Sequence, residues 1–217
     1  QQEGILDQVD FLHVYLNEYT QIPVFLLKNK IAVYTSNDHG NLADIGKFFP
    51  LQQASENSYI LTLDDDLLYP EDYVKVMLGK LQQYKNNAFI CVHGNILPSH
   101  KLNSYYKEKI GIHYAKKLAS DIRVDIPGTG TLAFHSKLYK VDLKHFKKPF
   151  MTDIWMYKVA KDNHIPIISI QRSDFWIKPL ILSPDKFSIY KKFFQNDMIP
   201  TEIVNKIRKG ESCNEYY

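Results

Sequence analysis

The sequence predicts an α/β fold in which a mixed, mostly parallel sheet is flanked by helices. Short apolar runs alternate with segments whose apolar residues recur at helical spacing, which is typical of strand–helix–strand units. Acidic and glycine-containing segments follow several apolar runs, as they do where open α/β sheets bind ligands at the carboxyl ends of their strands. The 217 residues, 45% apolar and 24% charged, suffice for one well-buried globular domain.

The expected elements follow one another at short intervals. Strand-like runs occupy 9–16, 31–35, 59–63, 88–92, 122–126, 131–134 and 165–170. Helical spacing occupies 42–54, 70–84, 152–161, 187–194 and 199–207. The second of these helices has Pro70 in its first position, followed by Glu71 and Asp72, whose charges are favourable at the positive end of a helix dipole. We expect residues 1–180 to form the main domain and residues 181–217 a helical extension packed on it.

Three consecutive aspartates, Asp64, Asp65 and Asp66, close the apolar strand at 59–63. In extended backbone Asp64 and Asp66 point to the same side, with Cα atoms roughly 6.5–7 Å apart, so both carboxylates can reach one cation. A divalent ion would relieve their repulsion, and magnesium or manganese typically takes one or two carboxylates together with phosphate oxygens and water. A solvated turn or a helix-capping cluster is the alternative interpretation.

Two further segments carry candidate binding residues. Asp44 and Lys47 lie about one helical turn apart and share a face, where a carboxylate suits a base or ribose and an ammonium suits phosphate. A surface ion pair between them is the alternative. The turn at 127–130 contains two glycines, which permit close backbone approach to a ligand. A tight hairpin between strands explains the same glycines.

Asp153 follows Thr152 at the start of a predicted helix. With Thr152 as N-cap, the carboxylate is a favourable partner of the helix dipole. If a cleft lies over this helix end, the same carboxylate is placed to take a proton from an attacking hydroxyl. The residues alone leave both interpretations open.

Several other chemistries lack support. Cys91 lies in an apolar strand and Cys213 in a polar tail, which indicates neither a disulfide framework nor a zinc site and fits a reducing, cytoplasmic location. The eight histidines lack metal-ligand spacing, no G-x-S-x-G segment supports acyl transfer, and no aromatic and arginine array indicates nucleic-acid binding. No run of about 18 apolar residues is present. The amphipathic segment 187–194 fits either the inner face of a membrane or packing onto the domain.

A series of short motifs runs in order along the chain from about residue 5 to residue 180. They are V-Y-L-N at 14–17, G-K-F-F at 46–49, L-T-L-D-D-D at 61–66 with Y-P at 69–70, H-G at 93–94, G-T-G at 128–130 with A-F at 133–134, D-I-W at 153–155 and I-P at 165–166. In this order the series resembles the GT-A glycosyltransferases, in particular bacterial family-two-like enzymes of capsule and surface polysaccharide synthesis. The resemblance implies a Rossmann-like GT-A sheet whose first strand and base-binding loop would precede residue 1.

The resemblance also implies an inverting transfer of a sugar from a UDP-sugar to an oligosaccharide or lipid-linked glycan, with Mn²⁺ or Mg²⁺ as cofactor. Asp153 would be the catalytic base that deprotonates the acceptor hydroxyl, and Asp66 and Asp64 would be metal ligands. The remaining implied contacts are Asn17, Asp44, Lys47, Asp64 and Asp65 along the donor nucleotide and its diphosphate, and His93, Gly128 and Thr129 around the acceptor or donor sugar.

Two other functions stay open. A sugar-nucleotide nucleotidyltransferase also uses a Rossmann-like sheet with acidic metal ligands, and a Gly- and Arg-rich loop upstream would distinguish it. A non-catalytic glycan-binding domain would keep the GT-A sheet, although the presence of all three aspartates together with Asp153 argues against it. For either enzyme we expect a cytoplasmic protein that works without nucleic acid, at the inner face of the membrane if it binds lipid-linked glycans.

Overall fold

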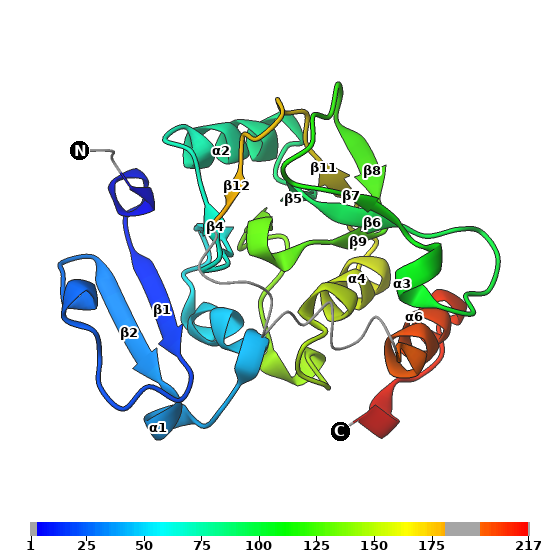
Figure 1. Cartoon of the computed structure of the whole chain (residues 1–217), viewed down its shortest axis with the longest axis horizontal. Coiled ribbons are helices and arrows are strands. Elements are labelled where there is room, and N and C mark those ends of the chain that lie inside the picture. Colours follow the sequence, from blue (N-terminus) through cyan, green and yellow to red (C-terminus); the bar gives the residue numbers. More distant parts are fainter. Residues whose placement is uncertain (1–3, 181–195, 217) are drawn as a thin grey trace.

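The computed structural model describes residues 4–180 and 196–216, and its centre is a five-stranded mixed sheet (Figure 1). In spatial order its strands are β3 (Tyr59–Leu61), β10 (Ala133–His135), β5 (Phe89–Cys91), β11 (Ile167–Ser169) and β8 (Ile122–Val124). In this described sheet β5 and β11 pair in parallel, whereas the other three pairings are antiparallel. The α/β class and the mixed sheet are confirmed, but the prediction of mostly parallel strands is wrong for these pairings. The reason is that β10 enters between β3 and β5 from a short turn rather than through a helical crossover, so it runs opposite to both.

Smaller sheets accompany the central one. The parallel pair of β1 (Leu12–Leu16) and β2 (Ile31–Thr35) lies at one end of the molecule, at the left of Figure 1. The remaining pairings join β6 (Gly94–Ile96) to both β7 (Ile110–Ile112) and β9 (Ile126–Pro127), and β4 (Leu67–Leu68) to β12 (Lys178–Pro179). The first two predicted strands therefore form a pair of their own instead of an edge of the main sheet.

The longer helices are α2 (Tyr73–Gln83), α4 (Thr152–Asp162) and α6 (Met198–Lys209), close to the predicted ranges, with α1 (Ser36–His39) and α3 (Tyr105–Glu108) as shorter turns. The helix predicted at 42–54 is instead a 3₁₀ helix, η3 (Ala43–Gln53), which contains Pro50. In an α-helix the Pro50 ring would clash with the carbonyl of Gly46. The helix predicted at 187–194 lies outside the described residues.

The start of α2 is set by a glutamine from the N-terminal segment. Gln8, in η1 (Ile5–Gln8), donates from Nε2 to Pro70 O at 3.1 Å and accepts from Val74 N at 3.0 Å. Asp72 holds the N-cap position, but its side chain accepts from Trp176 Nε1 instead of capping the helix. Pro70 therefore lies before the helix, and the prediction that it occupies the first helical position is wrong.

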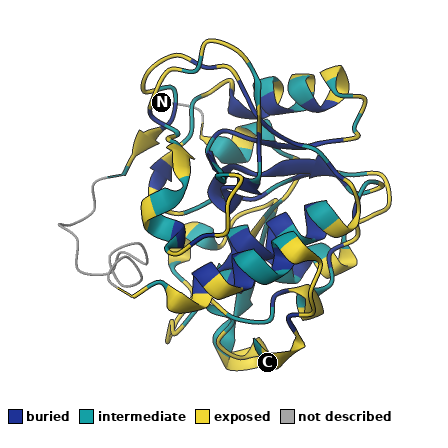
Figure 2. Ribbon diagram, turned by 90° about the vertical axis from the view of Figure 1, so that its right-hand side faces the viewer, coloured by how far each residue is buried: buried dark blue, intermediate teal, exposed yellow. Residues whose placement is uncertain are grey.

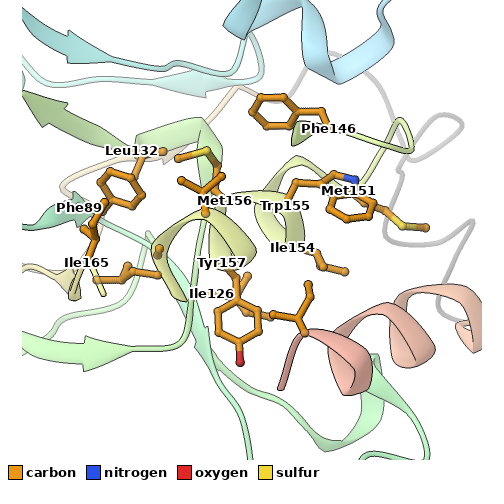
Figure 3. Packing of buried hydrophobic residues seen from close by; sticks show 14 of the residues in the cluster. Phe89, Ile126, Leu132, Phe146, Met151, Ile154, Trp155, Met156, Tyr157 and Ile165 are labelled. Atoms are coloured by element: carbon orange, nitrogen blue, oxygen red, sulfur yellow. The ribbon is translucent and has the colours of Figure 1, made fainter. Parts of the chain in front are cut away.

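Helices cover both faces of the central sheet. Phe89 and Cys91 of β5 belong to one buried cluster and Ile90 to another, because successive strand residues point to opposite faces. Helix α4 covers the first face, where Trp155 and Met156 are fully buried and Met156 lies on the side of Phe89 (Figure 3). Helix α2 covers the second face. Figure 2 shows that such outer helices carry buried residues on one side and exposed residues on the other.

Helix α6 packs on α3 and α4, at the lower right of Figure 1. Its residues Ile203 and Val204 are fully buried. Asn205 exchanges two hydrogen bonds of 3.0 and 2.9 Å with the backbone of Leu102, and Thr201 Oγ1 accepts from Tyr105 N at 2.8 Å. The described part of the C-terminal extension is thus joined to the main domain by apolar packing and by hydrogen bonds.

Candidate functional site

The glycine-containing turn between β9 and β10 is buried and held by the residues that follow two central strands. It includes η4 (Thr129–Thr131). Thr62, directly after β3, donates from Oγ1 to Thr129 O at 2.5 Å. Val92, directly after β5, donates its N–H to Thr131 Oγ1 at 3.0 Å. The turn therefore lies at the carboxyl ends of β3 and β5, where the sequence predicts a ligand site.

Asp64 lies against this turn and pairs with Lys47 of η3. A Cβ atom on Gly130 would lie 2.1 Å from Asp64 Oδ2, so the glycine is what lets the carboxylate approach the backbone. The Tyr69 hydroxyl joins the two segments, donating to Gly130 O at 2.6 Å and accepting from Asp64 N at 2.8 Å. Burial lowers the pKa of Lys47, but the attraction of Asp64, with a smaller contribution from Asp153, more than offsets this and leaves the pKa above its ordinary value.

Asp153 is bound by the neighbouring residue of the same turn. Its Oδ1 accepts hydrogen bonds from Thr129 N at 2.8 Å and from Thr129 Oγ1 at 2.7 Å. Its Oδ2 receives no hydrogen bond from residues 4–180 or 196–216. Because Thr129 and Gly130 are consecutive, the carboxylates of Asp153 and Asp64 lie against two adjacent residues of the turn. The structure thus brings together two acids that the sequence places in separate elements.

His93 is the third polar side chain at the turn. A Cβ atom on Gly128 would lie 1.9 Å from His93 Nε2, so the imidazole rests directly on the glycine. Its Nδ1 lies 3.0 Å from Thr131 Oγ1. Burial lowers the pKa of His93, while Asp153 and Asp64 act in the opposite direction. The predicted residues Gly128, Thr129 and His93 therefore lie in one site with the two acids.

Asp44 is near the site, but its carboxylate is used to hold α4. It accepts from Phe150 N at 2.5 Å, from Thr152 N at 3.2 Å and from Thr152 Oγ1 at 2.8 Å. The prediction of Thr152 as N-cap is wrong, because Met151 occupies that position without a side-chain hydrogen bond and Asp44 supplies the acceptor. Burial raises the pKa of Asp44, and its hydrogen bonds oppose this effect only in part.

The side chain of Asn17 likewise binds backbone groups of the protein itself. Its Nδ2 donates to Ala43 O at 2.8 Å and its Oδ1 accepts from Leu42 N at 3.2 Å. Ala43 has a positive φ of 49°, a conformation that L-residues rarely adopt without support. Asn17 therefore fixes the first residues of η3, the element that carries Lys47. A direct contact of Asn17 with a nucleotide stays a prediction.

The other two aspartates of the triad, Asp65 and Asp66, are exposed. The carboxyl group of Asp66 is partly desolvated, which raises its pKa, and the charges of Asp64 and Asp65 raise the pKa further. In the described part of the chain no three His, Cys, Asp or Glu side chains converge on a single point with metal-ligand geometry. The donor set still fits Mg²⁺ or Mn²⁺, which binds through one or two carboxylates and completes its shell with phosphate and water.

Sequence reasoning missed several residues that build the site. Tyr69 and Thr131 hold the turn, and Lys109 lies 4.4 Å and 4.7 Å from the ring centroids of Tyr105 and Tyr106. Burial lowers the pKa of Lys109 to about 8, partly opposed by Asp153. Tyr69 follows the aspartates closely enough to be noticed, and Tyr105 and Tyr106 lie four and three residues before Lys109, which is the spacing of neighbours on one face of a helix.

Comparison with known proteins adds no relative: the chain matches no family model and no curated protein. In residues 4–180 and 196–216, no helix has both the length and the apolar character needed to cross a membrane.

Proposed function

We propose that this protein is an inverting glycosyltransferase that transfers a sugar from a UDP-sugar, with Mn²⁺ or Mg²⁺, to a glycan acceptor in surface polysaccharide or glycoconjugate synthesis in the cytoplasm. The observation that carries the proposal is the shared turn, in which Thr129 binds Asp153 and Gly130 lies against Asp64. A carboxylate suited to proton abstraction and one suited to a metal-bound diphosphate thus lie beside consecutive residues. The ordered motif series supports the same function.

In the proposed reaction, the acceptor hydroxyl gives its proton to Asp153 Oδ2 while its oxygen bonds to the anomeric carbon of the donor. The bond between that carbon and the diphosphate oxygen breaks, and attack opposite the leaving group inverts the configuration. Asp153 suits this role because Oδ1 is fixed by Thr129 and no described residue donates a hydrogen bond to Oδ2. His93, whose lowered pKa favours the neutral imidazole, is placed to hydrogen bond a sugar hydroxyl.

Positive charge is required beside the leaving diphosphate. Asp66 and Asp64 would hold the divalent cation, which supplies Lewis-acid stabilisation of the leaving group when bound. Lys47, paired with Asp64, adds a fixed charge at the same place. Asp65 lies next to both metal ligands and would face the ribose or the diphosphate.

Thermal unfolding in the presence of nucleotide sugars tests this proposal. UDP-glucose, UDP-galactose and their N-acetyl forms are each added with and without Mn²⁺. We expect at least one donor to raise the melting temperature only with the cation, because a ligand that binds only the folded state stabilises it. Asp66→Ala should abolish this shift. Asp153→Ala should keep the shift and lose turnover, measured as UDP release with water as acceptor.

Three other outcomes would contradict the assignment of Asp153 or favour a different function. Near-normal UDP release by Asp153→Ala would show that Asp153 is not the base. Release of pyrophosphate from UTP and a sugar phosphate would favour a nucleotidyltransferase. Glycan binding that shifts the melting temperature without any turnover would favour a non-catalytic domain.

A further inference from the structure

Four side chains from three elements lie in a row of close polar contacts that ends at Asp153. Thr129 Oγ1 lies 2.7 Å from Asp153 Oδ1 and 3.0 Å from Thr152 Oγ1. Thr152 Oγ1 in turn lies 2.8 Å from Asp44 Oδ2. Thr129 and Thr152 are only 2% and 4% exposed, so water does not compete for their hydroxyls. We propose that the Thr129 hydroxyl positions Asp153, an inference that rests on the proposed role of Asp153 as the base.

The hydroxyl hydrogens decide which of these contacts are hydrogen bonds. Each threonine supplies one hydrogen, whereas there are three contacts. Thr152 Oγ1 donates its hydrogen to Asp44 Oδ2. The Thr129 hydroxyl donates to Asp153 Oδ1, so each of the two carboxylates receives one hydroxyl hydrogen.

This arrangement has a consequence for the proposed base. The buried Thr129 gives Asp153 Oδ1 two hydrogen bonds, one from its N–H and one from its hydroxyl. Hydrogen bonds to a charged group are among the strong ones, so the hydroxyl helps to fix the plane of the carboxylate. Oδ2 is then presented to the acceptor.

The test uses Thr129→Val, which removes the hydroxyl but keeps the backbone N–H and nearly the same volume. UDP release from the donor found in the thermal screen is measured against pH. Since hydrogen bonds to charged groups are the strong ones, we expect kcat to fall roughly 10- to 100-fold with little change in KM for the donor, and the acidic limb of the profile to move up by about one pH unit.

Three further variants separate positioning from a general loss of packing. Thr129→Ser should restore kcat and the profile, because it returns the hydroxyl. Thr129→Ala also removes the hydroxyl, should move both in the same direction as Thr129→Val, and carries the test if Thr129→Val does not fold. Thr201→Val is the matched control: this buried threonine lies in α6, accepts from Tyr105 N, and should leave kcat and the profile unchanged.

A second readout does not depend on turnover. Carbon-13 NMR of aspartate-labelled protein, with Asp153→Asn for assignment, follows the Asp153 carboxyl directly, and its titration midpoint should move to higher pH in Thr129→Val. If the midpoint moves while no nucleotide sugar binds and no UDP is released, the positioning of Asp153 by Thr129 is supported and the proposed function fails. If the midpoint and the pH profile are the same in Thr129→Val and the unsubstituted protein, the positioning role is overturned.

Discussion

Gly128 and Gly130 decide, as single residues, how closely polar side chains approach the central turn. Any side chain at Gly128 would collide with the imidazole of His93, and any side chain at Gly130 would collide with the carboxylate of Asp64. The sequence predicts that these glycines permit close approach to a ligand. The structure places the protein's own side chains in that space, so the glycines determine where His93 and Asp64 lie.

Gly130→Ala should therefore displace Asp64 from its place beside Lys47. Because a flexible carboxylate can swing away, we expect a loss of about 1–3 kcal/mol in the free energy of unfolding, together with loss of the metal-dependent thermal shift. Gly79→Ala is the control, since Gly79 lies in α2 with open space around it and should gain up to about 1 kcal/mol. Denaturant unfolding and the nucleotide-sugar screen measure both. A full thermal shift in Gly130→Ala would mean that Asp64 does not need its observed position.

The sequence predicts those residues of the site that carry a local signal. Acids at the end of an apolar run and glycines in a turn are local signals, and they identify Asp64 and the turn that holds it. The contact of Asp44 with Thr152 spans 108 residues of chain, and no local pattern encodes it. The same limit hides the role of Tyr69, because the contact of its hydroxyl with Gly130 spans 61 residues.

Among the elements, α4 depends on a distant side chain at its N-terminus. Its first turn carries Asp153, and its amide groups are met by Asp44 of η3 rather than by its own N-cap residue. Periodicity predicts where α4 begins and ends. The partner of its N-terminus, like the insertion of β10 between β3 and β5, is set by tertiary packing and is invisible in the sequence of either element.

Asp44→Asn should reveal what burial does to this helix cap. Burial raises the pKa of Asp44, so the folded state binds the proton more tightly than the unfolded chain. The contribution of Asp44 to stability is therefore complete below its unfolded pKa and decreases as the pH rises through the higher folded value. We expect the melting temperature of Asp44→Asn to rise relative to that of the unsubstituted protein as the pH increases from about 4 to about 7. A growing deficit over that range would show that the charge itself stabilises α4.

Across the whole molecule, the described C-terminal segment and the central sheet share one apolar core. The cluster that contains Phe89 of β5 and Trp155 of α4 also contains Ile203 of α6. The polar contacts of α6 with α3 add to this packing. We therefore expect α6 to unfold together with the sheet rather than separately.

Ile203→Ala tests that expectation. Ile203 is fully buried, so its truncation should lower the free energy of unfolding by about 2–5 kcal/mol through lost burial and a cavity. Met198→Ala, in the same helix but 75% exposed, should change it by less than about 0.5 kcal/mol. Circular dichroism and tryptophan fluorescence should give coincident transitions in both variants. An early helical transition that leaves the tryptophan signal unmoved would instead separate α6 from the core.

The turn that joins β9 to β10 also bears on how far the rest of the chain is free to change. Asp153 is hydrogen-bonded to Thr129, and Asp64 packs against the next residue, Gly130, so the spacing of the two acids depends on this short stretch of backbone. Loops remote from the turn could lengthen without altering that spacing. A substitution at Thr129 or Gly130 would move one acid relative to the other even if every helix stayed in place.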